Sequence, residues 1–308
     1  MSSAPTFATP LVQSTRSSIL QYTFPKPHHN LVLTGRSRAA WHTSFVIPQL
    51  DVLLDAGLCV NKLRPRNVFI THGHSDHTLV TPAFVQTQDP PDVYCPSEVE
   101  PVLEGYIVAH KRLDKGGVVP EGVAVNHRHR MHGVRHGTVV DLGSQAGITV
   151  TAFDCDHTVP CLGYLFSSTT RRLRAEYVGL PAAEIKRIRH EVGGADNMTA
   201  PFTRPVFAFL GDTTAATLAA APDWLAEGEG IPVVITECSF LRDEHYAQAQ
   251  KTKHTAWKDL EPVVRRWPRT TFVLTHFSMR YSDREVVDFF KGLDHCPSNI
   301  VIWADGEA

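Results

Sequence analysis

Four possible metal ligands stand within the sequence Thr71-His72-Gly73-His74-Ser75-Asp76-His77. They follow residues 67–71, an apolar run that predicts a buried β-strand. Side chains at a strand end can converge on one point, and imidazole with carboxylate suits Zn²⁺ or Mn²⁺. The alternative is a polar loop that happens to be rich in histidine. Because the pattern H-x-H-x-D-H is improbable by chance at such a place, we interpret these residues as metal ligands.

Short apolar runs, broken by glycine, proline and aspartate, predict the elements that position this cluster. Several are apolar throughout, which suits strands buried on both faces. Strands are expected at residues 44–48, 51–55, 67–71, 92–95, 138–141, 148–153, 163–166, 206–211, 232–237, 271–275 and 300–303. Helices are expected at residues 99–113, after a capping box of Ser97 and Glu100, and at 182–189, 214–221, 255–267 and 282–293. This order implies a layered α/β or α+β fold, with a single domain at residues 31–308.

The composition of the 308-residue chain is that of a globular protein, with 43% apolar residues and a net charge of −2. A chain of this length can bury a substantial core without disulfide or metal staples. The balanced charge excludes a general polyanion binder, so contact with nucleic acid would need a local basic patch. The six cysteines include no CxxC pair, which predicts free thiols in a reducing compartment. No apolar run approaches the roughly 20 residues that a membrane-spanning helix needs.

The first fifty residues contain no acidic side chain, and Asp51 is the first. A start rich in serine and threonine can be an organelle transit peptide, but Arg16 is the only basic residue before Lys26. We therefore expect a flexible leader at residues 1–30 and a cytoplasmic protein, with the nucleus or the mitochondrion as alternatives.

The string HGHSDH resembles the signature of the metallo-β-lactamase superfamily, whose fold is a pair of packed β-sheets with helices on both outer faces. The phrases DHTVPCLGY, FLGDT, TECSF, KTKHT and LTHFSMRY are more specific. Together they resemble ribonuclease Z, the endonuclease that trims the 3′ end of precursor tRNA. The similarity is to the short form, runs over residues 44–281, and implies an αββα sandwich of two mixed sheets.

The resemblance also implies a centre of two metal ions, zinc or alternatively manganese. Two ions roughly 3.5–4 Å apart can stabilise both the attacking and the leaving oxygen in phosphodiester cleavage. The side chains that would hold them follow or open predicted strands: His72, His74 and His157 for one ion, Asp76, His77 and His276 for the other, and Asp212 as the bridge.

Four residues would carry further roles by the same resemblance. Asp76 would also act as general base on the attacking water, and His254 would donate a proton to the leaving 3′ oxygen. Glu237 would orient His254, and Asp55 would orient the metal ligands. The residues alone leave alternatives open: His254 could stand beside a helix cap, because Thr255 begins a helical pattern, and Glu237 could be an ordinary acid at a strand end.

Other polar residues close to His157 compete with it. Cys155 and Cys161 bracket His157 and could bind zinc, but the ligand set is complete without them, so we expect small core residues. Asp154 and Asp156 stay open as competing ligands.

Residues 167–205 are the least core-like part of the interior, and we expect an arm-like insertion there. Between residues 171 and 190, six basic side chains face only Glu176 and Glu184: Arg171, Arg172, Arg174, Lys186, Arg187 and Arg189. By resemblance this arm would grip the tRNA body through phosphate contacts that are salt-sensitive and indifferent to base identity. The alternative is a loop with solvated charges. The basic residues at 127–132 suit an exposed edge strand or loop, with a phosphate contact as the alternative.

The sequence departs from the resemblance near its start. Many ribonuclease Z chains open with a glycine-rich loop and a Pro/Lys/Arg/Asn loop that senses the tRNA 3′ end. Here the region reads LVLTGRSRAAWHTSFVIP, similar to the plant-like short form, with Arg36 and Arg38 as candidate replacements.

We therefore expect a metal-dependent endoribonuclease that acts on precursor tRNA, is a homodimer by resemblance, and has no DNA or membrane partner. One alternative is a small-molecule hydrolase of the same superfamily that acts on a phosphodiester, thioester or lactone; the basic arm and the His254 motif speak against it. The other is a non-catalytic RNA-binding relative; the complete ligand set speaks against it.

Overall fold

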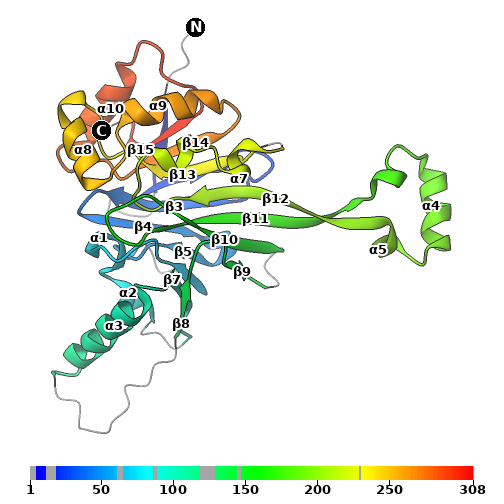
Figure 1. Ribbon diagram of the computed structural model, residues 1–308, viewed down its shortest axis with the longest axis horizontal. Helices are drawn as coiled ribbons and strands as arrows, with labels where there is room; N and C mark the ends of the chain where they lie inside the picture. Colours follow the sequence, from blue (N-terminus) through cyan, green and yellow to red (C-terminus); the bar gives the residue numbers. More distant parts are fainter. Residues whose placement is uncertain are drawn as a thin grey trace.

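The strands of this protein form two packed layers with helices outside them, and a long arm projects from one side (Figure 1). The computed structural model describes residues 5–11, 19–60, 65–85, 89–117, 129–143, 147–228 and 230–307. No helix among these residues has the length and apolar character that crossing a membrane requires.

The two sheets share strand β1 (Thr6–Pro10), which pairs antiparallel with β2 and parallel with β15. The first sheet continues in the order β2 (Leu20–Thr23), β3 (Val32–Arg38), β4 (His42–Ile47), β5 (Val52–Leu54), β6 (Asn67–Phe69), β7 (Asp92–Pro96) and β8 (Arg130–Val134). The second continues as β15 (Ile300–Asp305), β14 (Thr271–Thr275), β13 (Val233–Glu237), β12 (Thr199–Phe209), β11 (Leu162–Leu173), β10 (Ile148–Asp154) and β9 (Val139–Asp141). Both sheets are mixed. Neighbouring strands are parallel from β5 to β8, from β12 to β15, and between β1 and β15. All other neighbouring strands are antiparallel.

The main hydrophobic core lies between the sheets. Phe45 and Phe69 of the first sheet meet Phe209 and Phe166 of the second, with ring centroids 6.1 and 5.5 Å apart. A second core packs α9 and α10 on β13, β14 and β15, and a third packs α3 on β6 and β7. The αββα sandwich that the resemblance implies is therefore confirmed.

The helices form where apolar residues recur at helical spacing. In α9, Trp257, Leu260 and Val264 are buried on one face, and α10 begins with a capping box of Ser282 and Glu285. The helices are α1 (Ser75–Thr78), α2 (Thr81–Val85), α3 (Glu100–Asp114), α4 (Ala182–Glu191), α5 (Ala195–Met198), α6 (Ala216–Ala219), α7 (Asp223–Ala226), α8 (Tyr246–Thr252), α9 (Trp257–Arg266) and α10 (Asp283–Lys291).

The capping box predicted at Ser97 and Glu100 is wrong. Helix α3 begins at Glu100 with Val99 at its N-cap, and no side chain caps it. The Ser97 hydroxyl instead donates to the Glu98 carboxylate at 3.1 Å. The spacing of the motif was present, but the chain enters the helix two residues later than the motif requires.

The expected flexible leader at residues 1–30 does not hold for the described part of that segment. Strand β1 lies between β2 and β15 and bonds to both, and Ala8 and Leu20 are buried. Backbone pairing on both edges outweighs the polar composition that suggested a leader. Residues 1–4 and 12–18 of the predicted leader lie outside the described residues.

The arm expected at residues 167–205 is a two-stranded ribbon that ends in helices. Strands β11 and β12 stay paired from Tyr164↔Phe209 out to Leu173↔Thr199, and α4 and α5 lie at the tip (Figure 1). Beyond the sandwich the ribbon has no third strand beside it, so its side chains are exposed or half-buried.

Candidate metal centre

The seven predicted ligands meet at one edge of the sandwich, where four strands end. His72 and His74 lie in the loop after β6, and Asp76 and His77 open α1. His157, Asp212 and His276 follow β10, β12 and β14. Their ligand atoms form two overlapping groups, each within 4.8 Å: the first donor group is His72, His74, His157 and Asp212, and the second is Asp76, His77, His276 and Asp212.

The first donor group is a compact set of three imidazoles and one carboxylate oxygen. His74 Nδ1 lies 3.0 Å from His72 Nε2 and 3.4 Å from His157 Nε2. Asp212 Oδ2 lies 3.6 Å from His72 Nε2 and 4.0 Å from His157 Nε2. His72 and His157 are buried, and His74 is half-buried at the surface of the group.

The second donor group uses the other oxygen of Asp212. His77 Nε2 and His276 Nε2 are 3.3 Å apart, and Asp212 Oδ1 lies 3.3 and 3.4 Å from them. Asp76 Oδ2 is 3.6 Å from His77 Nε2 and 3.4 Å from His276 Nε2. Asp212 thus turns one oxygen to each donor group, which is the arrangement of a bridging carboxylate.

These distances suit the coordination of divalent cations. Four ligands placed tetrahedrally about a metal at about 2.0–2.1 Å are roughly 3.3 Å from one another. Most of the separations within both donor groups lie close to that value. Buried imidazoles and carboxylates are the ligands of zinc and related ions, so the residues fit the metal that the resemblance implies.

Each sheet contributes one buried carboxylate that orients ligand histidines. In the first sheet this carboxylate is Asp55. Asp55 Oδ2 lies 2.7 Å from His77 Nδ1, and Asp55 Oδ1 accepts the Thr71 N–H at 2.8 Å. The Thr71 hydroxyl donates to Asp55 and is 3.0 Å from His72 Nδ1. Asp55 therefore fixes His77 directly and His72 through a hydroxyl, with Nε2 of each ring toward Asp212.

Glu237 holds the corresponding position in the second sheet. The Ser239 hydroxyl donates to Glu237 Oε2 at 2.6 Å and is 3.0 Å from His276 Nδ1. Glu237 Oε1 is 2.8 Å from His254 Nδ1. The same carboxylate accepts the N–H groups of Thr213 and Thr255, which follow Asp212 and His254 in the chain. Glu237 therefore ties together the loops that carry Asp212, His254 and His276.

His254 stands at the rim of the centre rather than inside it. Its side chain is 17% exposed, and its Nδ1 lies 3.9 Å from Asp212 Oδ2. Burial lowers the pKa of His254, but the charge and hydrogen bond of Glu237 outweigh burial and raise that pKa to about 9. A third overlapping group of possible donors is Asp212, Glu237, His254 and His276. Because both Glu237 oxygens already accept N–H or O–H donors, this group is a poorer cation site than the other two.

Charges within the centre shift the protonation of its histidines in opposite directions. Burial and the neighbouring His77 lower the pKa of His72 well below its usual range, which keeps a neutral imidazole of the kind that binds metal. For His77, burial lowers the pKa, but Asp212 and Asp55 outweigh it and raise the pKa well above its usual range.

The backbone is left-handed at three positions of the centre. Asp55, His276 and Ala40 have φ angles of 56°, 60° and 58°, which non-glycine residues seldom adopt. Such residues cluster at functional sites, where the surrounding structure holds them in place. At Ala40 the role of the left-handed backbone is visible, because the Ala40 N–H donates to Asp76 Oδ2 at 2.9 Å.

The competitors of His157 do not join the donor groups. Cys155 and Cys161 are buried, and Cys161 Sγ donates to the Asp212 carbonyl at 3.2 Å. Asp156 pairs with Lys253, and Asp154 points to His136 at the surface. His157 is held by the Lys253 carbonyl, 3.0 Å from its Nδ1.

The basic residues of the arm are partly neutralised by acids of the same arm. Arg171 lies 3.5 Å from Asp196, and Arg187 pairs with Glu184 and Glu191. Arg172 stacks on Phe202, its guanidinium carbon 3.7 Å from the ring centre. Among the described residues, no ion pair is found for the remaining three predicted contacts, Arg174, Lys186 and Arg189.

Two other basic clusters take structural partners. In the segment at 127–132, residues 127 and 128 lie outside the described part. Arg130 and His132, on the edge strand β8, both pair with Asp92 of β7. Arg36 and Arg38, the candidates for sensing the RNA end, are largely buried and pair with Asp283. In the described residues of the two clusters, Arg36, Arg38, Arg130 and His132 are all paired with acids.

Sequence reasoning missed three residues of the centre: Thr71, Ser239 and Ala40. Thr71 and Ser239 stand inside the quoted THGHSDH and TECSF phrases, so each motif contained its hydroxyl. Only the fold shows which histidine each hydroxyl meets. Nothing in the sequence marked Ala40, whose contribution is a backbone N–H.

The chain is similar to several known proteins. A model of the Beta-lactamase superfamily domain matches residues 60–205. The chain is 26% identical over 272 residues to tRNase Z TRZ1 of Arabidopsis thaliana, covering 85% of this chain and 90% of that protein. It is 27% identical to the chloroplastic tRNase Z TRZ2 of the same plant, covering 82% and 69%. The crystal structure of human tRNase Z, short form, aligns over 98% of this chain and 95% of that chain, at 18% identity and a TM-score of 0.47.

Proposed function

The chain is a relative of the tRNase Z proteins within the beta-lactamase superfamily, and on this basis we propose that it is a metal-dependent endoribonuclease that removes the 3′ trailer of precursor tRNA. One observation carries the proposal: two donor groups share Asp212, and His254 stands beside them on a buried carboxylate. That combination supplies both cation binding and a proton donor at one point.

The two donor groups would hold two divalent cations, zinc or alternatively manganese. Ions there would lower the pKa of water and neutralise charge on the phosphodiester. Asp76 would accept the proton of the attacking water. As the bond from phosphorus to the 3′ oxygen breaks, His254 would donate its proton to that oxygen, which leaves the phosphate on the trailer. Glu237 would hold the His254 ring through Nδ1, with the other ring nitrogen as donor.

Further proposals about the arm, the oligomeric state and the location rest on the same premise. The arm would bind the tRNA body through phosphate contacts of its basic residues. The short form of the enzyme is proposed on the same resemblance. We further propose a homodimer, which the mass of the protein in solution tests, and a cytoplasmic location, which cell fractionation tests, with the nucleus or the mitochondrion as alternatives.

A cleavage assay tests the proposed function. The purified, zinc-loaded chain is incubated with a precursor tRNA that carries a 3′ trailer, and the cut is mapped. We expect one cut at the end of the tRNA body, with a 3′ hydroxyl on the tRNA, and none from Asp212→Ala. Binding without cleavage would support the non-catalytic alternative. Cleavage of small phosphodiesters, thioesters or lactones but not of the precursor would support the small-molecule hydrolase.

A further inference from the structure

The loop between β3 and β4 carries an exposed aromatic residue, Trp41, beside the second donor group. The neighbouring Ala40 N–H donates to Asp76 Oδ2 at 2.9 Å, which places the Trp41 Cα within about 8 Å of that carboxylate. Yet the Trp41 side chain is 53% exposed. A large aromatic surface left open at the rim of a reaction centre is available to substrate.

The Trp41 loop is fixed in place by buried contacts. The Arg38 guanidinium donates to the backbone carbonyls of Ser278 and Tyr281, in the loop that follows His276. The Ala39 N–H donates to the Phe277 carbonyl at 3.2 Å. These bonds join the Trp41 loop to the loop after His276, so the indole has a defined position relative to the donor groups.

Two neighbouring side chains lie beside the indole, and about half of its surface stays exposed. The His42 ring lies against it with centroids 4.4 Å apart, and the Arg36 guanidinium carbon is 5.8 Å from its centre. Exposed aromatic rings supported in this way serve as stacking surfaces for unpaired nucleic-acid bases. Arg36 and Arg38, which the sequence suggested for contact with RNA, instead hold this surface in place.

We propose that Trp41 is the stacking platform for the first base of the 3′ trailer, an inference that rests on the proposed endoribonuclease function. His254, on the Asp212 Oδ2 side, would face the leaving 3′ oxygen and hence the last nucleotide of the tRNA. Asp76 belongs to the other donor group, and the Trp41 loop contacts Asp76 through the Ala40 N–H. The nucleotide that remains attached to the phosphorus, the first of the trailer, is therefore the one near Trp41.

Paired changes in protein and substrate test this proposal. The kcat/KM of Trp41→Ala should fall by roughly 5- to 150-fold on a precursor tRNA, the range for loss of one stacked base. Trp41→Phe should retain most of the rate, and Trp41→Leu, which keeps apolar bulk without a flat π-face, should not. On a precursor whose first trailer nucleotide is abasic, wild type should slow by a similar factor, and Trp41→Ala should cause little further loss.

Three outcomes would overturn the platform: an unchanged rate for Trp41→Ala, equal rates for the leucine and phenylalanine variants, or coupling to an abasic site at the last tRNA nucleotide instead. In each of these the wild-type enzyme still cuts the precursor. Absence of any cut by wild type would overturn the proposed function itself, and the platform with it. Equal zinc content and thermal stability of the variants would show that the exposed side chain can be removed without disturbing the fold.

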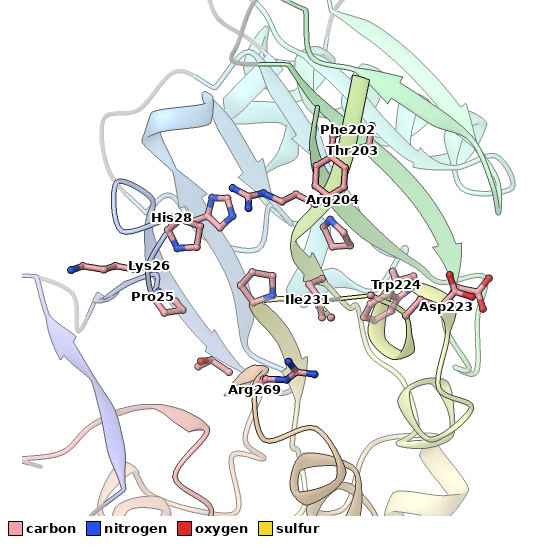
Figure 2. A pocket seen from close by; sticks show the side chains of 17 residues that line it. Pro25, Lys26, His28, Phe202, Thr203, Arg204, Asp223, Trp224, Ile231 and Arg269 are labelled. Atoms are coloured by element: carbon pink, nitrogen blue, oxygen red, sulfur yellow. The ribbon is translucent and has the colours of Figure 1, made fainter. Parts of the chain in front are cut away.

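A second inference concerns a pocket of about 550 Å³ at the base of the arm. Its walls come from the loop after β2, from β12, from α7 and from the start of β14. Figure 2 shows Arg204 reaching toward His28, with Trp224 and Asp223 on the opposite side. Arg204 lies five residues before Phe209, the end of β12 nearest the donor groups, or about 16 Å along the strand. The pocket is thus distinct from the metal centre.

Two side chains of the pocket each have a nitrogen atom whose hydrogen-bonding capacity is unused. Arg204 Nε and His28 Nε2 are buried from solvent, yet no hydrogen-bond partner is found for them in the described part of the chain. Lys26 and Arg269 add positive charge, while Asp223 and Glu227 lie in the same wall as Trp224. We infer that the pocket binds a nucleotide, with its phosphate at Arg204 and His28 and its sugar or base toward Trp224 and the carboxylates. Its volume suits a ligand of that size.

Calorimetric titration with 5′-AMP tests the pocket. Arg204→Gln should weaken binding roughly tenfold or more, the scale of one charge-assisted hydrogen bond. The matched control Arg284→Gln, an exposed arginine on α10, should not. Asp212→Ala should bind as wild type does, because it changes only the metal centre. A parallel arm measures precursor tRNA: weaker binding by Arg204→Gln there, without binding of free 5′-AMP, would identify the phosphate as one of RNA. Binding abolished by Asp212→Ala, or no effect of Arg204→Gln on either ligand, would overturn the site.

Discussion

Asp55 and Glu237 occupy corresponding positions in the two sheets, and the difference between them separates metal binding from proton transfer. Each is buried at a strand end, touches one imidazole directly and reaches a second through a hydroxyl. Both imidazoles on Asp55, His72 and His77, belong to donor groups. On Glu237, His276 belongs to a donor group, whereas His254 is at the rim and 17% exposed. We infer that a buried carboxylate holding two histidines serves metal binding when both histidines belong to donor groups. It serves proton transfer when one of them, here His254, lies at the rim.

Removing Asp212, which the histidines held by Asp55 and Glu237 both approach, should have the largest effect. Asp212 offers one oxygen to each donor group, so Asp212→Ala should lose both cations and all cleavage. Elemental analysis and the precursor assay check this. Retention of one tightly bound ion with partial activity would mean that the two groups do not share Asp212.

Replacing His254, at the rim, should lower the rate of cleavage but leave the metal content unchanged. His254→Ala should keep both ions and lose about 10²–10⁴-fold in kcat, the usual contribution of general acid catalysis. Metal analysis beside single-turnover kinetics separates these effects. Loss of an ion would reassign His254 to the ligand set, and an unchanged rate would return it to a neighbour of a helix cap.

Removing the hydroxyl of Thr71 or of Ser239 should have an intermediate effect, and the two variants can be compared directly. Thr71→Val and Ser239→Ala each remove one link between a carboxylate and a ligand histidine. Each should weaken metal binding about 10- to 100-fold, the scale found for residues that orient ligands. Competition with a chelator measures the affinity. If only one variant weakened binding, the correspondence between Asp55 and Glu237 would be geometric and not functional.

The arm should show the smallest effect and no loss of chemistry. Arg174→Ala, Lys186→Ala and Arg189→Ala together remove the basic residues for which the described arm shows no ion pair, so they should weaken precursor binding. Each lost phosphate contact should flatten the slope of log affinity against log salt by about 0.7–0.9. The matched control, Arg171→Ala with Arg187→Ala, removes arginines already paired with acids and should change the slope less. Equal slopes for wild type and both variants would reduce the arm to a solvated ribbon.

The sequence predicted the centre better than its surroundings, for a physical reason. Metal chemistry needs particular residue types at strand ends, so His72, His157 and His276 stood out and the fold brings them together. A layered α/β architecture was also predictable, because buried strands are continuously apolar, whereas the αββα sandwich was implied only by the family resemblance. β14 begins and ends at the residues expected.

What failed depended on contacts between distant segments. Strand β1 was taken for a leader because its composition is polar, and its place in the sheet comes from pairing with β15, nearly three hundred residues later. Arg38 looked available for RNA until the fold buried it against the loop after His276. Charge alone does not show whether a partner lies across the fold.

The central claim is that two donor groups sharing Asp212 make this chain a two-metal endonuclease. The most direct measurement is elemental analysis of the native protein, followed by cleavage of precursor tRNA before and after chelation. We predict two ions per chain, loss of cleavage when they are removed, and recovery with Zn²⁺ or Mn²⁺. A protein without stoichiometric metal that regains no cleavage with either ion would contradict the account.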